Sequence, residues 1–190
     1  MKNITVPLIL FGLLILGTAF GQADSNTIVW GDHSLEWKDF SGPIDQSSGH
    51  IASTRSQLRA PNSWNSDSLT IVITAEFIKN KSWVIGSPSD NLLQHEQLHF
   101  DITEYHARLF RKTMASYRFK SYDTVPAEVT ALFNERFKIY QAMQEKYDKA
   151  TNHSKNYKAQ VEWNLKVAGL LEITNDYKAH TCNVYIGYLK

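Results

Sequence analysis

The sequence predicts an α+β fold in which an N-terminal antiparallel sheet packs against three C-terminal helices. Residues 27–86 contain short runs of β-branched and aromatic residues, separated by turn clusters rich in Gly, Pro, Ser and Asn. From residue 89 onward, apolar residues recur at the spacing of one helix face. Because the strands precede the helices and do not alternate with them, the pattern favours separate sheet and helix layers.

We expect strands at residues 27–30, 35–37, 51–58 and 69–77. The last of these is the strongest, since it is β-branched and mostly alternates between apolar and polar residues. The turn cluster at 61–63 lies between the last two segments and favours an antiparallel meander.

The first predicted helix spans about residues 89–118. It follows a cluster of Ser, Pro and Asp residues, which suit a helix cap and first turn, and no Gly or Pro interrupts it before residue 121. A second helix is expected at about 126–148, with Pro126 in its first turn. A polar break at 151–154 separates it from a third helix at about 155–173.

The N-terminus has the features of a secretory signal peptide. Lys2 supplies a positive charge, residues 4–16 form a short apolar run, and small residues occupy the cleavage positions before Gln22. We therefore expect residues 1–21 to be removed and residues 22–190 to form a single domain. The mature protein is expected to be exported, to the periplasm or the medium, with no stable membrane insertion.

The overall composition is that of an ordinary globular protein. Hydrophobic residues make up 43% of the chain and charged residues 21%, and the formal net charge is +1. With no basic stripe, we expect no nucleic-acid partner. Cys182 is the sole cysteine, so it cannot form an internal disulfide, and we expect it to be a buried small apolar residue. The composition leaves the oligomeric state open.

The first predicted helix carries the sequence His95-Glu96-Gln97-Leu98-His99. Residues four apart lie on one helix face, roughly 40° apart around the axis, so both imidazoles can bind one metal ion. Glu96 lies roughly 100° from His95, which is too far for a natural third ligand but near enough to hold a metal-bound water. This pattern is typical of zinc hydrolases, in which Glu96 would be the general base.

A catalytic zinc ion usually has three protein ligands, so a third residue is needed. His106 is seven residues beyond His99, about 10 Å along an unbroken helix, and is excluded. Asp101 and Glu104 point away from the motif face, and we expect them to be solvent-exposed or to support the ligands. The remaining candidates are His153, in the break after the second helix, and Glu128 or Glu135 on that helix.

Residues on both sides of the motif point to one known family. They comprise Tyr147-Asp148-x-x-Thr151-x-His153-Ser154 and Gln160-x-x-Trp163 after the motif, and Trp37-x-Asp39-Phe40-x-Gly42-x-Ile44 and Phe77-x-x-x-x-Ser82-Trp83-Val84 before it. With the motif segment 95–104, this set resembles a family of bacterial exported proteins described as predicted secreted zinc-dependent proteases, and otherwise as a domain of unknown function. The resemblance spans about Trp30 to Leu171. It implies that His153 is the third metal ligand, although many members have Gly where this chain has Ser154.

The resemblance implies a zincin-like metallopeptidase with one Zn²⁺ per chain, held by His95, His99 and His153, and a peptide or protein substrate. Glu96 would take a proton from water and pass it to the leaving amine. Tyr147 and Tyr157 are candidate oxyanion donors, although the favoured interpretation of both is as ordinary packing residues, and Asp148 is expected to orient a ligand histidine. The strand at 69–77 is a candidate edge for an extended peptide. The alternatives are a zinc hydrolase of non-peptide amides, or an exported metal- or peptide-binding domain without turnover.

Overall fold

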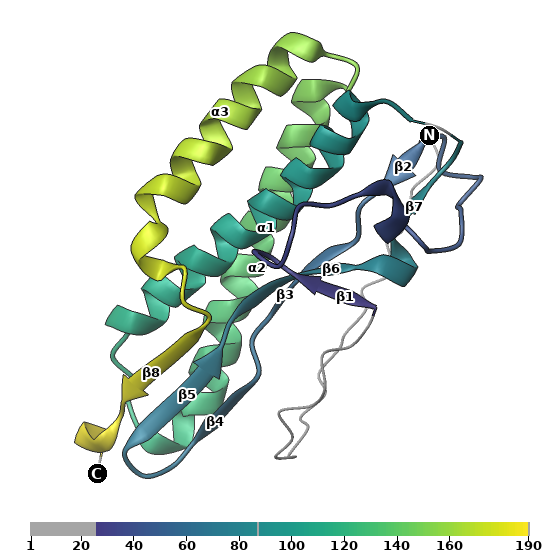
Figure 1. Ribbon diagram of the computed structural model, residues 1–190. Coiled ribbons are helices and arrows are strands. Elements are labelled where there is room, and N and C mark those ends of the chain that lie inside the picture. Colours follow the sequence, from purple (N-terminus) through teal and green to yellow (C-terminus); the bar gives the residue numbers. More distant parts are fainter. Residues whose placement is uncertain (1–25, 87, 190) are drawn as a thin grey trace, which may run out of the picture.

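The computed structural model describes residues 26–86 and 88–189, in which helices and small antiparallel sheets form separate layers (Figure 1). The predicted signal peptide and its cleavage site lie outside the described residues. The expected α+β fold is confirmed: N-terminal antiparallel sheets pack against the helices. Within the described part of the chain, no helix is both long enough and apolar enough to cross a membrane.

The strands form three small antiparallel sheets within the described residues, where the sequence predicted one meander. In two of them the central strand is flanked on both edges, and the C-terminal strand β8 pairs with the N-terminal strand β5. The sheets have the orders β1 (Thr27–Val29), β6 (Thr74–Ile78), β3 (Ser56–Arg59); β4 (Asn62–Trp64), β5 (Ser68–Val72), β8 (Thr181–Tyr185); and β2 (Ala52–Ser53), β7 (Trp83–Val84).

The predicted strand at 69–77 is two strands, β5 and β6, which meet at Ile73 and belong to different sheets. The Ile73 backbone forms hydrogen bonds with partners outside the strand pairings of β5 and β6. Its N–H donates to the carbonyl of His180 at 2.8 Å, and its carbonyl accepts from the Arg111 guanidinium at 2.7 and 2.9 Å. Because β5 and β6 each have neighbours on both edges, the expectation that this segment binds an extended peptide is wrong.

The helices are α1 (Asp90–Ser116), α2 (Val125–Thr151) and α3 (Tyr157–Ile173), within a few residues of the predicted bounds. Ser89 caps α1 by accepting a hydrogen bond from the Leu92 N–H, as the sequence suggested. Figure 1 shows α1 between the strands and the other two helices, in agreement with its contacts to β6, β3, α2 and α3. This central position explains why the motif helix is largely buried. The 3₁₀ helices are η1 (Trp37–Asp39), η2 (Lys79–Lys81), η3 (Tyr122–Thr124), η4 (Asn175–Tyr177) and η5 (Gly187–Leu189).

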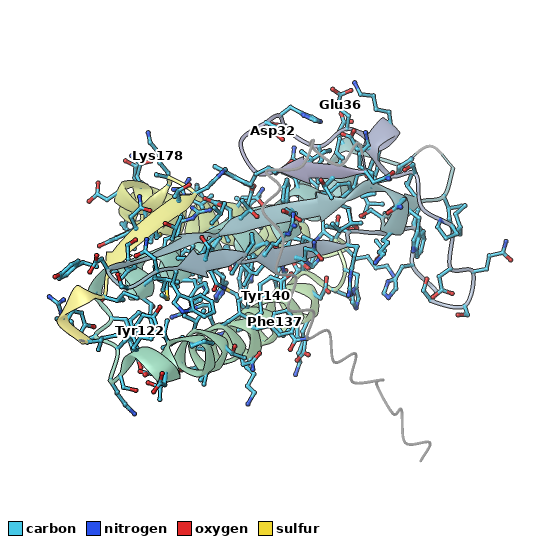
Figure 2. All side chains as sticks on the ribbon, turned by 90° about the horizontal axis from the view of Figure 1, so that it is seen from below. Asp32, Glu36, Tyr122, Phe137, Tyr140 and Lys178 are labelled. Carbon is cyan, nitrogen blue, oxygen red and sulfur yellow. The ribbon has the colours of Figure 1, made fainter. Side chains whose placement is uncertain are left out.

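The face of α2 nearest the strands is lined by aromatic side chains. Figure 2 shows Phe137 and Tyr140 on this side of the helix, and the Tyr140 hydroxyl lies 3.3 Å from Ser56 Oγ on β3. Cys182 on β8 is partly buried against the core, and burial raises the pKa of its thiol. This agrees with its expected role as a small apolar residue.

Glu104 is part of a buried ionic cluster on α1. It is fully buried and forms ion pairs of 2.9 Å with Arg108 and with Arg111. Arg108 also donates to the carbonyl of Leu171, and Arg111 to that of Tyr177, so the cluster ties α1 to the C-terminal segment. The expectation that Glu104 faces solvent or supports the metal ligands is therefore wrong.

Candidate metal centre

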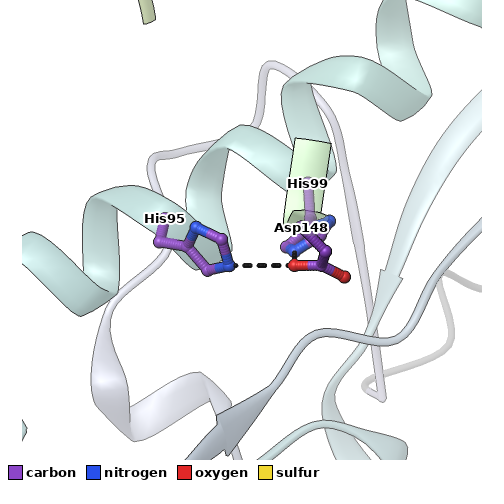
Figure 3. A group of neighbouring side chains, drawn as sticks. All are labelled: His95, His99 and Asp148. Carbon is purple, nitrogen blue, oxygen red and sulfur yellow. Dashed lines mark hydrogen bonds and ion pairs between the residues drawn. The ribbon is translucent and has the colours of Figure 1, made fainter. Parts of the chain in front are cut away.

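His95 and His99 on α1 and Asp148 on α2 form a compact group that could hold a metal ion. One carboxylate oxygen, Asp148 Oδ1, lies 3.2 Å from His95 Nε2 and 3.1 Å from His99 Nε2 (Figure 3). The side chains of the two histidines are 3% and 14% exposed, and that of Asp148 is 32% exposed. The two histidines are therefore largely enclosed by protein, whereas solvent reaches the Asp148 carboxylate.

Packing between helices fixes the positions of these three side chains. The ring of Tyr147 is fully buried and stacks on the His95 ring, with centroids 4.7 Å apart, while it meets His99 edge-on at 4.8 Å. Its hydroxyl donates to the carbonyl of His95. Because Asp148 follows Tyr147 on α2, the same packing holds the carboxylate against both imidazoles.

Two glutamines form hydrogen bonds with the Nδ1 atoms of His95 and His99. Gln144 Nε2 donates to the carbonyl of His99, so its Oε1 faces His99 Nδ1 at 2.7 Å. Gln160 Nε2 donates to Asn164, so its Oε1 faces His95 Nδ1 at 3.0 Å. Each Nδ1 is therefore the donor, and both Nε2 atoms point to Asp148. Gln160 is one of the residues that carry the family resemblance, whereas no motif in the sequence marks Gln144.

This hydrogen bonding requires positive charge at the centre of the group. With Nδ1 donating, each Nε2 meets the carboxylate either as the N–H of a cationic imidazolium or as a lone pair directed at a cation. Neighbouring ligand atoms around a tetrahedral ion bound at about 2.0–2.1 Å are about 3.3 Å apart, close to the observed spacings to Asp148. Two imidazoles and a carboxylate are a donor set that suits Zn²⁺, so the residues present fit the ion.

The charges of the group perturb one another strongly. Burial lowers the pKa of His99, but its hydrogen bond to Asp148 and the negative charges of Glu96 and Asp148 outweigh this effect, so the pKa lies above its ordinary value. Burial raises the pKa of Asp148, but the hydrogen bonds from His95 and His99 hold it well below its usual range. Asp148 is therefore ionised and available as a ligand.

Glu96 is 4% exposed on α1, between the two motif histidines in sequence. Within residues 26–86 and 88–189, its carboxylate has no hydrogen-bonding or ion-pair partner. Its backbone carbonyl accepts from Thr54 Oγ1 beside β2. The charge of Glu96 raises the pKa of His99, so the carboxylate is close enough to the centre to accept a proton there.

His153 lies beside the group but is not a member of its compact set. Its Nδ1 is 3.4 Å from Asp148 Oδ1, and its side chain is 49% exposed. The turn after α2 places it there: Asn152, His153 and Ser154 have φ of 48°, 51° and 68°. This left-handed turn is easiest for glycine, which fits the glycine of the resembling family at the position of Ser154.

The other ligand candidates lie elsewhere. Glu128 and Glu135 are about 30 and 20 Å along the continuous helix α2 from Asp148. Glu128 forms hydrogen bonds with Tyr117 and Thr124, and Glu135 is exposed. Neither glutamate can therefore bind the same ion as His95 and His99. His106 is buried away from the group, and its Nε2 lies 3.4 Å from Met143 Sδ. Its distance from His99 along the helix predicted this separation.

Tyr147 is a packing residue, as the sequence favoured, while Tyr157 and Asp101 have other surroundings than expected. Tyr147 is not free to bind an oxyanion, because its hydroxyl is buried and bonded to His95 and Gln160; burial raises its pKa further above the ordinary value. Tyr157 is 67% exposed at the start of α3. Asp101 is bonded to Trp30 Nε1 at 2.8 Å and to Gln97, so it joins α1 to the segment after β1.

Residues 80–154 match the model of a family described as a bacterial protein of unknown function, DUF922. The matched segment contains both motif histidines, Glu96, Asp148 and His153. No curated protein and no solved structure matches the chain. The family description names no activity, so the function has to be argued from the site.

Proposed function

We propose that the protein is an exported zinc-dependent hydrolase that cleaves peptide bonds, with one Zn²⁺ held by His95, His99 and Asp148. In this proposal Asp148 takes the ligand position for which the sequence favoured His153. His153 then contacts the Asp148 carboxylate from the solvent side. The observation that carries the proposal is that Asp148 Oδ1 lies 3.2 Å from His95 Nε2 and 3.1 Å from His99 Nε2, with the three atoms within 4.8 Å of one another, beside the buried residue Glu96.

Three protein ligands and an open position distinguish a catalytic zinc site from a structural one. The open position would lie on the side where Asp148 is partly exposed, since the histidines are covered from behind by Tyr147. A zinc ion bound here supplies Lewis-acid chemistry, because it lowers the pKa of water to about 7 and polarises a carbonyl group.

The chain's own residues complete the mechanism. The Glu96 carboxylate accepts a proton from the attacking water and passes it to the leaving nitrogen of the substrate. Gln144 and Gln160 keep the histidines in the tautomer that binds metal through Nε2. Tyr147 excludes water from behind His95, which preserves the strength of these hydrogen bonds.

The substrate and the location of the enzyme rest on two further arguments. The resemblance to predicted secreted zinc-dependent proteases supports a peptide or protein substrate, as does a glutamate placed directly after the first motif histidine. The charged n-region and short apolar run of residues 1–21 support export, with residues 22–190 as the mature zincin-like domain.

The test is hydrolysis of a mixed peptide library by zinc-loaded protein, followed by mass spectrometry. We expect cleavage that a chelator abolishes and added zinc restores. Glu96→Gln should lower the rate by about 10²–10⁴-fold while zinc stays bound, because general acid–base catalysis contributes that much. Glu162→Gln, which changes an exposed glutamate on α3, is the matched control and should cleave normally.

Each alternative has its own result in this experiment. Full activity of Glu96→Gln would show that the mechanism is wrong. Binding of peptides by the zinc-loaded protein without cleavage would indicate a binding domain. Cleavage restricted to non-peptide amides would keep the hydrolytic centre and change its substrate class.

A further inference from the structure

Two exposed histidines meet beside the candidate metal centre. His50 precedes β2 and His153 follows α2, yet their ring centroids are 4.7 Å apart and their planes are inclined by 54°. At this separation each ring can turn a nitrogen toward one point between them. A pair of imidazoles brought together from distant parts of the chain is a donor pair for a transition metal ion.

The rings have few other partners. In the described part of the chain, the one polar contact of the His153 ring is with Asp148, and the His50 ring nitrogens have none. A shared cation is the arrangement that gives both rings a partner.

Asp148 offers a third donor to this pair. Its Oδ1 receives the polar contacts from His95, His99 and His153, whereas its Oδ2 forms no hydrogen bond or ion pair with any described residue. A carboxylate with one oxygen in a metal centre can extend the other to a neighbouring ion, as in two-metal hydrolytic sites. His153 already lies beside this carboxylate, with its Nδ1 3.4 Å from Oδ1.

The surroundings leave room for an ion from solvent. Asp148 and His153 line a shallow cavity of about 400 Å³, together with Glu145, Lys149 and Asn152. Glu145 adds a negative charge that attracts cations, and Lys149 offsets it. Such a site is more open than the first centre, so it should bind more weakly.

We propose that His50, His153 and the outer oxygen of Asp148 form a second, weaker site for a divalent transition metal ion such as Zn²⁺. The ion would lie on the solvent side of the first centre and share the Asp148 carboxylate with it. Imidazole nitrogen with a single carboxylate favours Zn²⁺, Co²⁺, Ni²⁺ or Cu²⁺ over Ca²⁺ and Mg²⁺, which prefer oxygen ligands.

The test is isothermal titration calorimetry of Zn²⁺ into the tag-free, chelator-stripped protein, with the bound metal counted by mass spectrometry. We expect two binding events in the wild type, the second at least about tenfold weaker than the first. His50→Ala and His153→Ala should each lose the second event and keep the first. His33→Ala is the matched control, since the side chain of His33 is 45% exposed and contacts Asp39 instead; it should keep both.

Three outcomes would overturn the proposal. These are a single event in the wild type, a second event that survives His50→Ala, and loss of the first event in His153→Ala. The last would make His153 a ligand of the first ion. Because the titration measures binding, its result is independent of whether the protein hydrolyses peptides, and failure of the second site leaves the proposed hydrolase intact.

Discussion

His106 should make the folded state sensitive to acid, and replacing it with leucine should remove that sensitivity. The side chain is 1% exposed on α1, and its Nδ1 has no hydrogen-bonding partner. Burial, helped by the positive charge of Arg136, lowers its pKa from 6.5 to about 4. The imidazole is therefore neutral in the folded protein at pH values where an unfolded chain would already be protonated.

The magnitude follows from the two pKa values. As the pH falls below 6.5, His106 becomes protonated in the unfolded chain but stays neutral in the folded protein. The free energy of unfolding therefore decreases. The decrease continues to about pH 4 and then levels off. At about 1.4 kcal/mol per pKa unit, the full loss is about 3 kcal/mol.

Urea unfolding of zinc-free wild type and His106→Leu at pH 7.5, 6.5, 5.5 and 4.5 would measure this loss. The difference between the two proteins cancels the contributions of other titrating groups. We expect the variant to gain stability relative to the wild type as the pH falls, by about 2.5 kcal/mol at pH 4.5. A difference that stays constant over this range would refute the assignment of a neutral, buried His106.

Further predictions concern the positioning residues, the turn after α2 and the buried ionic cluster. Gln144→Leu and Gln160→Leu should each weaken zinc binding by about 10–100-fold, measured by competition with a chromophoric chelator, because they release the ligand histidines; unchanged affinity would contradict the tautomer assignment. Ser154→Gly should raise the free energy of unfolding by about 1 kcal/mol, because a serine φ of 68° is strained, and a decrease in urea unfolding would argue against strain. Arg111→Met should lower it by about 3–5 kcal/mol by leaving Glu104 buried with less compensation, and Glu104→Gln in the same protein should recover part of the loss; a loss below about 1 kcal/mol would contradict this.

The motif helix could be predicted from sequence because its information is local. A spacing of four residues places His95 and His99 on one helix face whatever the rest of the fold does. The same arithmetic correctly separated His106 from the site. The helix bounds also follow from local signals, such as the Ser89 cap and the polar break after α2.

The proposed ligand Asp148 could not be identified in the same way, because its position depends on how α2 packs against α1. A signal was nevertheless present: Gln144 and Asp148 are polar residues four apart on an otherwise amphipathic helix, matching the spacing of His95 and His99. The segment containing Tyr147 and His153, which carried the resemblance, also contains Asp148. Distinguishing the two possible ligands within it required the conformation of the turn.

Long-range pairing explains the other differences. The break at Ile73 arises from bonds to His180 and Arg111, which are distant in sequence. From the sequence alone, Glu104 is expected to be a solvent-exposed helix residue. Its burial depends on the C-terminal segment, which contacts Arg111 through Tyr177. Local periodicity contains no information on either contact.

An X-ray structure of the zinc-loaded protein, with data collected on both sides of the zinc absorption edge, tests the central claim most directly. We expect an anomalous peak within about 2.0–2.2 Å of His95 Nε2, His99 Nε2 and an oxygen of Asp148, with Glu96 beside it but not bonded to it. A peak bonded to His153 in place of Asp148, or the lack of any peak between the two motif histidines, would contradict the proposed centre.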